Sequence, residues 1–175
     1  MKDKINVKPY SDEEILFLTT GKVTIAKSEI NVINFINETY KLKSTNKKLY
    51  LGMLKDDVYL NIHNKLKINI KNYNISLKVD AVKHILKHHS NDKEYLRGQV
   101  PIENNDFLLI PLIINNYDEV YNSGTTKDGK PSITFKKQIE DTYYLVTYIS
   151  DKNRNLEIQT MYKKRNHSLC LIQDS

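Results

Sequence analysis

The pattern of hydrophobic and polar residues predicts one amphipathic helix near the N-terminus. Residues 28–42 place hydrophobic side chains at the spacing of a single helix face, namely Ile30, Ile33, Ile36 and Tyr40. Ser28 is a suitable N-cap for this helix. The polar run 43–48 that follows is typical of a loop. We therefore expect residues 1–48 to form an N-terminal extension with one helix, and residues 49–175 to form the main domain.

The next part of the chain is predicted to hold two short strands and then a helix. Residues 49–54 and 68–77 alternate as strands do, and the second segment contains a turn at Asn72. Residues 80–89 place hydrophobic side chains on one helical stripe, at Val82, Ile85 and Leu86. This order predicts that a helix directly follows the second strand.

A further helix is predicted after the chain breakers Gly98 and Pro101. It covers residues 106–114, with Asn104 or Asn105 as its N-cap. Because proline lacks a backbone donor, we expect this helix to be kinked or restarted at Pro111.

Beyond residue 124 the hydrophobic period changes to two. Three alternating segments are predicted to be strands: 132–139, 142–150 and 155–163. Their connections are short enough for hairpins, which predicts an antiparallel meander. Because helices come first and a sheet comes last, we expect an α+β fold with the helices packed on one face of the sheet.

Composition and charge narrow the classes of function. The net charge of +6 and pI of about 9.1 suit a phosphate-bearing partner without identifying it. Cys170 is the only cysteine, which excludes a disulfide framework and a cysteine-based zinc site within the chain. The sequence shows no secretory leader and no hydrophobic run of membrane-spanning length, which predicts a cytoplasmic protein without a membrane partner. A toxin delivered by another route would look the same.

Three of the five histidines lie in the predicted helix 80–89. His84 and His88 are four residues apart and so lie on one helix face, and His89 follows directly. Imidazoles titrate near neutral pH, so this group is suited to proton transfer at an anionic substrate. The structural alternative for any single histidine is that it stabilises the helix C-terminus as a cation.

Metal binding is the rival chemistry for the histidine pair. His-x-x-x-His on one helix face is valid zinc spacing, but Ile85 stands where the usual glutamate would be. The remaining histidines, His63 and His167, have no ligand motif around them. We therefore expect neither a metal nor another cofactor.

A second candidate group lies on the last predicted strand. Alternation places one set on one face, Leu156, Ile158, Thr160 and Tyr162, and the other set on the opposite face, Glu157, Gln159 and Met161. Thr160 and Tyr162 continue a hydrophobic face near the strand end, where they would hydrogen-bond a phosphate or stack a base. The alternative is that both residue types simply favour strands. The basic loop 123–130 lacks the spacing of a P-loop but is a candidate phosphate contact.

The chain resembles the phage-associated branch of the barnase–EndoU–colicin–RelE (BECR) nuclease superfamily, from about Leu49 to Tyr162. The resemblance rests on the order of six segments: Lys83–His89, Arg97–Ile102, Asp106–Pro111, Ile114–Asp118, Ile133–Lys136 and Leu156–Lys163. It implies a helical N-terminal part packed on a four-stranded antiparallel sheet, and metal-independent ribonuclease activity.

The candidate site combines the histidine helix, the lysines and the last strand. The catalytic candidates are His84, His88, His89, Lys136, Thr160 and Tyr162. The substrate-binding candidates are Arg97, Lys130 and Lys137. The histidines would act as base and acid, and the lysines would stabilise the charged transition state.

These observations predict a metal-independent endoribonuclease that cleaves RNA by attack of the 2′-hydroxyl. The resemblance implies a toxin-like role or an association with phages or mobile elements. The expected partners are RNA, with tRNA as a candidate, and a candidate immunity protein. The rival hypothesis is a non-catalytic RNA- or protein-binding phage protein on the same fold, and a third is a phage structural or inhibitor protein.

Overall fold

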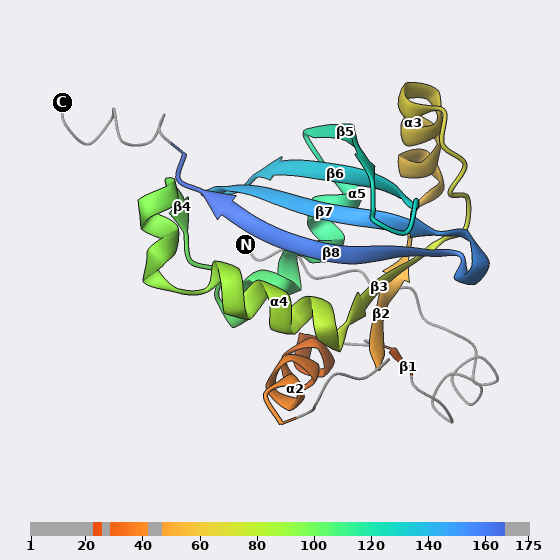
Figure 1. The fold of residues 1–175 in the computed structure, drawn as a ribbon. Coiled ribbons are helices and arrows are strands. Elements are labelled where there is room, and N and C mark those ends of the chain that lie inside the picture. Colours follow the sequence, from red (N-terminus) through yellow and green to blue (C-terminus); the bar gives the residue numbers. More distant parts are fainter. Residues whose placement is uncertain (1–22, 26–28, 42–46, 167–175) are drawn as a thin grey trace.

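Figure 1 shows the computed structural model of the chain, which describes residues 23–25, 29–41 and 47–166. One mixed sheet runs through its centre. The strands follow the order β1-β2-β3-β8-β7-β6-β5, and β4 pairs separately with β8. Their bounds are β1 (Val23–Ile25), β2 (Lys48–Met53), β3 (Asn74–Lys78), β4 (Gln99–Val100), β5 (Glu119–Thr125), β6 (Pro131–Gln138), β7 (Thr142–Ser150) and β8 (Asn155–Lys164).

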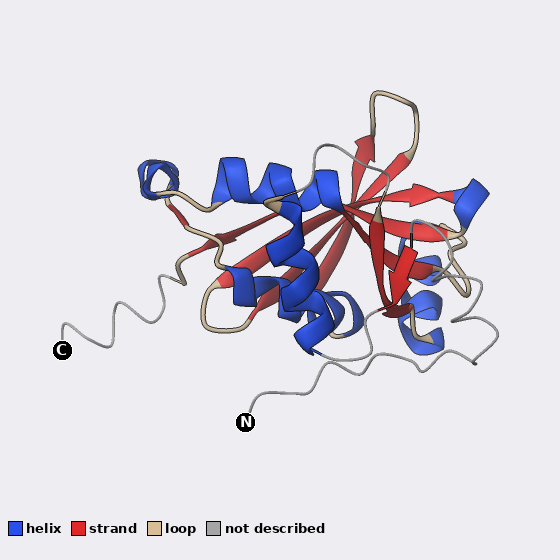
Figure 2. Cartoon of the chain, turned by 90° about the horizontal axis from the view of Figure 1, so that it is seen from below, coloured by secondary structure: helices blue, strands red, loops and turns tan. Residues whose placement is uncertain are grey.

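The helices complete an α+β fold, which confirms the predicted class. They are α2 (Glu29–Thr39), α3 (Asp56–Leu66), α4 (Val79–His89), α5 (Ile110–Asn115) and the 3₁₀ helices η1 (Asp92–Arg97), η2 (Asn104–Leu109) and η3 (Asp151–Asn153). Figure 2 shows α2 and α5 on one side of the strands, whereas α4 lies beside β8 toward the other side. The sequence had predicted helices on one face of the sheet only, and the position of α4 differs from that prediction.

The predicted meander is confirmed. Strands β6, β7 and β8 are antiparallel neighbours. The sheet is larger than the four-stranded antiparallel sheet that the resemblance implies. On one side, β5 pairs antiparallel with β6. On the other side, β3 pairs in parallel with the first residues of β8, and this pairing joins β2 and β1 to the meander.

The segment before β3 differs from the prediction. Residues 56–66 form α3, and only residues 74–78 of this region are extended. Lys67 and Asn72 have φ angles of 59° and 61°, which end the helix and turn the chain. The predicted turn at Asn72 is confirmed, but only residues after it form a strand, and the hydrophobic spacing before it reflects burial of side chains such as Ile70 in the core.

The predicted restart at Pro111 is confirmed, because η2 leads into α5 and Pro111 lies in its first turn. The N-cap before it is Glu103 rather than Asn104 or Asn105. Glu103 and Asp106 form a reciprocal capping box, which satisfies two backbone donors, whereas a single asparagine would satisfy one.

The described part of the N-terminal region packs on the rest of the molecule. Val32, Phe35 and Ile36 of α2 belong to the same hydrophobic core as the sheet residues. The predicted cap Ser28 and residues 42–46 lie outside the described residues, so a domain boundary at residue 48 stays a prediction.

Candidate active site

No described helix covers the face of β6, β7 and β8 that is turned toward the viewer in Figure 1, and we call it the open face. Paired residues on neighbouring strands point to the same side, so the register shows which side chains share this face. Lys136 pairs with Tyr144, and Tyr144 pairs with Tyr162. The two tyrosine rings are stacked, with centroids 4.9 Å apart and planes 7° apart. A row of lysine and two phenols therefore crosses the sheet.

A β-bulge determines which residues of β8 reach the open face. Val146 pairs with Thr160, but the next residue, Thr147, pairs with Ile158, so Gln159 is the extra residue. The bulge shifts the alternation by one position. Open-face positions are Glu157, Thr160 and Tyr162, and core positions are Leu156, Ile158 and Met161.

This geometry corrects the prediction for the last strand. Leu156 and Ile158 do not share a face with Thr160 and Tyr162, because simple alternation does not account for the extra residue. The hydroxyl oxygen of Thr160 is buried and has no hydrogen-bond partner among the described residues. Tyr162, in contrast, lies at the centre of a chain of ring contacts.

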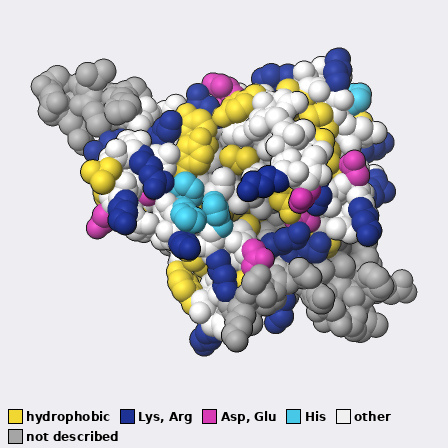
Figure 3. All heavy atoms as spheres, viewed as in Figure 1, with side chains coloured by type: hydrophobic (Ala, Val, Ile, Leu, Met, Phe, Trp, Pro, Cys, Tyr) yellow, Lys and Arg dark blue, Asp and Glu magenta, His cyan; other side chains and the backbone are white. Residues whose placement is uncertain are grey.

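Helix α4 places all three histidines beside this face. The rings of His84 and His88 have centroids 4.7 Å apart, and His84 lies 6.0 Å from His89. His89 in turn lies 5.8 Å from the ring of Tyr162. The histidine whose ring contacts β8 is therefore His89, which lies one residue further round the helix than His88. Figure 3 shows histidines gathered on this side of the molecule among lysine or arginine side chains.

Two pKa shifts follow from this crowding. Loss of surrounding water lowers the pKa of His84, and the neighbouring charges of His88, His89 and Lys87 lower it further. Burial raises the pKa of the Tyr162 phenol, with smaller contributions from Tyr121 and Tyr144. Near neutral pH, His84 is therefore suited to accept a proton, and the phenol of Tyr162 remains a hydrogen-bond donor.

The predicted lysines divide between the two faces. Lys136 lies on the open face, 3.1 Å from a carboxylate oxygen of Glu119 and 6.0 Å from the ring centre of Tyr144. Lys130 lies 5.1 Å from the ring centre of Tyr148, further along the same face. Lys137 lies on the other face, where it binds Asp118 at 3.0 Å. The structure therefore does not bring Lys137 to the histidines.

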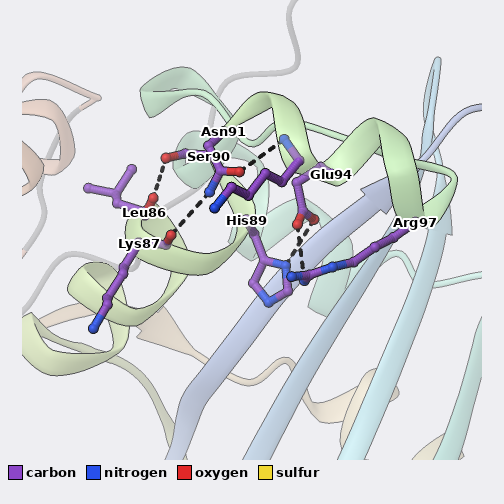
Figure 4. A network of polar contacts seen from close by, with 8 residues as sticks. Leu86, Lys87, His89, Ser90, Asn91, Glu94 and Arg97 are labelled. Carbon is purple, nitrogen blue, oxygen red and sulfur yellow. Dashed lines mark hydrogen bonds and ion pairs between the residues drawn. The ribbon is translucent and has the colours of Figure 1, made fainter.

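Beyond α4, η1 carries Glu94 and the predicted phosphate ligand Arg97. The Glu94 carboxylate binds His89 Nδ1 at 3.0 Å and the Arg97 guanidinium at 3.2 Å (Figure 4). Glu94 is fully buried, whereas the Arg97 side chain is 56% exposed. Arg97 is thus both a partner of Glu94 and open to solvent beside the histidines.

A second buried carboxylate, Glu157, was not predicted as a site residue. Its carboxylate lies 2.7 Å from Lys78 Nζ and accepts a hydrogen bond from the Tyr148 hydroxyl at 2.7 Å. Although burial opposes it, this pairing raises the pKa of Lys78. The signal in the sequence is a charged residue within a strand, but simple alternation placed Glu157 on the face opposite Thr160 and Tyr162.

A comparison with known families places this site in a nuclease domain. Residues 57–169, well over half of the chain, match the family described as "phage-Barnase-EndoU-ColicinE5/D-RelE like nuclease3". The chain belongs to this family. The matched region includes every candidate residue of the BECR-like site, from His84 to Tyr162, and excludes α2 and β2.

One curated protein is also similar to part of the chain. The chain is 29% identical over 122 residues to the "Probable intron-encoded endonuclease aI3" of Kluyveromyces lactis. The aligned region covers 69% of this BECR-family chain and 30% of that relative, so the chain spans less than a third of its length. No solved structure matches the chain.

Neither a metal-ligand cluster nor a membrane-spanning helix is present among the described residues. They contain no group of three or more histidine, cysteine or acidic side chains arranged to hold a metal ion. His63 instead faces the carbonyl of Ile68 at 3.2 Å, and His167 and Cys170 lie outside the described residues. No described helix has the length and hydrophobicity needed to cross a membrane.

Proposed function

We propose that this BECR-family protein is an endoribonuclease that cleaves RNA through attack of the substrate's own 2′-hydroxyl, without a metal ion. The observation that carries the proposal is the unbroken series of ring contacts from His84 through His89 to Tyr162 and Tyr144. This series joins proton-transfer groups on α4 to phenols and lysines on the open face, which is the combination that the chemistry needs.

The reaction transfers two protons. A base removes the proton of the 2′-hydroxyl, whose oxygen forms a bond to phosphorus. An acid donates a proton to the leaving 5′-oxygen as the phosphorus–oxygen bond breaks. His84 is suited to act as the base, because its lowered pKa favours the neutral ring. His89 is suited to act as the acid, because it faces the carboxylate of Glu94. The products carry a 2′,3′-cyclic phosphate and a 5′-hydroxyl.

Cations around the rings would stabilise the charged phosphorane. Lys136 and Lys164 lie 6.0 Å and 5.3 Å from the ring centre of Tyr144, and the exposed Arg97 binds Glu94, the partner of His89. The Tyr162 phenol is a further donor to a phosphate oxygen. We leave Lys137 out of this arrangement because it lies on the opposite face.

The decisive experiment incubates purified protein with total RNA in excess EDTA. We expect discrete fragments with cyclic phosphate ends, and no fragments from a variant that combines His84→Gln with His89→Gln. Cleavage that requires added divalent metal, or products with 5′-phosphate ends, would contradict the proposal. Separate reactions with purified tRNA would test the narrower proposal that tRNA is the substrate.

A non-catalytic RNA-binding role is the second candidate. The stacked tyrosines beside Lys136 and Lys164 would hold single-stranded RNA without any proton transfer. In that case the protein would bind RNA in a salt-dependent way and leave it intact under all conditions. A toxin-like or phage-associated role, a cytoplasmic location and an immunity partner are further proposals. Co-expression with a neighbouring small gene would test the toxin role and the immunity partner.

A further inference from the structure

Helix η1 has an unusual distribution of buried and exposed residues. Its hydrophobic side chains face solvent, since Tyr95 is 54% and Leu96 is 88% exposed, whereas its glutamate, Glu94, is fully buried. Burying a carboxylate is unfavourable unless it is paired, and exposing leucine wastes hydrophobic surface. Stability alone would favour the opposite arrangement. The segment is therefore arranged to bring the Glu94 carboxylate to its partners.

Several local interactions hold η1 against the end of α4 (Figure 4). The Ser90 hydroxyl donates to the carbonyl of Leu86, and the Asn91 side-chain amide donates to the carbonyl of Lys87 at 3.2 Å. Asn91 also caps η1 by accepting the backbone N–H of Lys93 at 3.0 Å. Gly98, with a φ of 70°, then ends η1. These contacts turn the chain back so that Glu94 faces His89.

The two oxygens of Glu94 have separate partners. Oε2 lies 3.0 Å from His89 Nδ1, and Oε1 accepts a hydrogen bond from Arg97 at 3.2 Å. An ionised carboxylate accepts hydrogen bonds and donates none, so Nδ1 of His89 carries the proton in this contact. Nε2, across the ring, is then the nitrogen left for proton exchange, and the ring lies beside Tyr162 and His84.

We propose that Glu94 is a positioning residue for His89, which it holds in the Nδ1–H tautomer with Nε2 available to the substrate. The inference rests on the proposed function and deepens it, because it selects His89 from three neighbouring histidines. A carboxylate on Nδ1 also balances the charge that the ring gains when Nε2 takes up a proton. Arg97 fixes the carboxylate from its other oxygen. No comparable contact is described for His84 or His88.

The test replaces Glu94 with glutamine, which keeps the shape but removes the charge and can donate as well as accept. We expect Glu94→Gln to lower kcat on the order of tenfold to a hundredfold with KM nearly unchanged. Combining it with His89→Gln should slow cleavage no further than His89→Gln alone, because Glu94 acts through that ring. Equal kcat in wild type and Glu94→Gln, or an additive double variant, would overturn the inference.

The matched control is Asp106→Asn, which removes another buried carboxylate from an ion pair on the far side of the sheet. Asp106 binds Lys163 at 2.9 Å, and Lys163 points to the opposite face of β8 from its neighbour Tyr162, whose ring contacts His89. This variant should lose stability but keep kcat per folded molecule. If Asp106→Asn lowered kcat as much as Glu94→Gln does, the effect of Glu94 would be merely structural.

A second measurement separates this inference from the proposed nuclease function. Nitrogen NMR of the neutral His89 ring should show a proton on Nδ1 in the wild type and a shift toward the Nε2–H tautomer in Glu94→Gln. Wild-type protein that fails to cleave RNA would refute the proposed function. The NMR measurement would still decide whether Glu94 sets the tautomer of His89. A wild-type ring in the Nε2–H form would refute the positioning role even if the protein cleaves RNA.

Discussion

The imidazole of His89 and the phenol of Tyr162 lie 5.8 Å apart between ring centres, across the boundary between α4 and β8. This contact links the histidine helix to the terminal strand, two groups that lie far apart in the sequence. Tyr162 continues the link to Tyr144 on β7. Proton-transfer groups and the open face therefore belong to one surface, and substitutions on either side should affect the same reaction.

The histidines should each contribute strongly to cleavage. We expect His84→Gln and the double variant His88→Gln, His89→Gln to lower kcat/KM by about a hundredfold to ten-thousandfold, because each removes a proton-transfer group. The wild type should show a bell-shaped pH profile, and each variant should lose one limb. The measurement is the rate of cleavage of a labelled RNA between pH 5 and pH 9.

Folding has to be compared in the same samples. His84 and His88 are exposed, so replacing either ring should leave the thermal midpoint almost unchanged, whereas replacing His89 also removes a partner of the buried Glu94. Wild-type rates in both histidine variants would show that α4 is only a scaffold. The active site would then have to lie among Lys130, Lys136, Thr160 and Tyr162.

The pKa of His84 should lie below the ordinary value of about 6.5. Loss of hydration is the main cause, and His88 and His89 contribute as neighbouring positive charges. Lys87 adds a further positive charge from the same helix. Because His88 is one of these charges, His88→Gln should raise the pKa of His84. A proton NMR titration of the ring resonances measures both values, and a His84 midpoint above 6.5 would refute the assignment of His84 as the base.

The same shift has a consequence for stability, whose sign is fixed by linkage. The unfolded chain binds the His84 proton more readily than the folded chain does, so folding is favoured less as the pH falls through the ordinary histidine range. Because His84 is exposed, this effect should be small. Lys87→Gln is a suitable variant to test this effect, since it removes one of the charges that lower the pKa of His84 and leaves all three rings in place.

The meander was predictable because its signal is local. Strands β6, β7 and β8 alternate hydrophobic and polar residues over long stretches, and short connections leave antiparallel pairing as the natural outcome. The parallel pairing of β3 with β8 was not predictable, because it depends on contacts between distant segments. The helix α3 was missed because polar residues fill most of its exposed face, and only Val58 and Ile62 are buried.

The site was predictable in its residue types but not in its geometry. Spacing alone groups the histidines on α4, but it cannot tell which of them reaches β8. The bulge at Gln159 is invisible to simple alternation, although it determines the face of Thr160 and Tyr162. Glu94 was missed for a different reason. A glutamate that directly follows Asp92 and Lys93 is typical of a solvated loop, and only the turn after α4 buries it.

A buried ion pair on the helix-covered side should matter for stability. Asp106 accepts hydrogen bonds from Lys163 and from the Tyr143 hydroxyl, and burial together with this contact raises the pKa of Tyr143. Asp106→Ala leaves the lysine buried without its partner, so we expect a loss of about 3–5 kcal/mol in the free energy of unfolding. Glu119→Ala, which breaks the exposed pair with Lys136, should change this free energy by about 1 kcal/mol or less. Urea denaturation measures both, and equal effects would contradict a structural role for Asp106.

Lys136 and Lys137 offer a matched test of the open face as the RNA-binding surface. The two lysines are adjacent in β6, and each is paired with a carboxylate, but they point to opposite faces of the sheet. Lys136→Ala should weaken RNA binding and reduce the slope of log affinity against log salt by roughly one phosphate contact. Lys137→Ala should leave this slope unchanged, because its side chain lies on the helix-covered side. Fluorescence anisotropy with a labelled single-stranded RNA, read from about 50 to 200 mM salt, measures both slopes. A larger effect for Lys137→Ala than for Lys136→Ala would place the RNA on the other face and would remove the tyrosine row from the site.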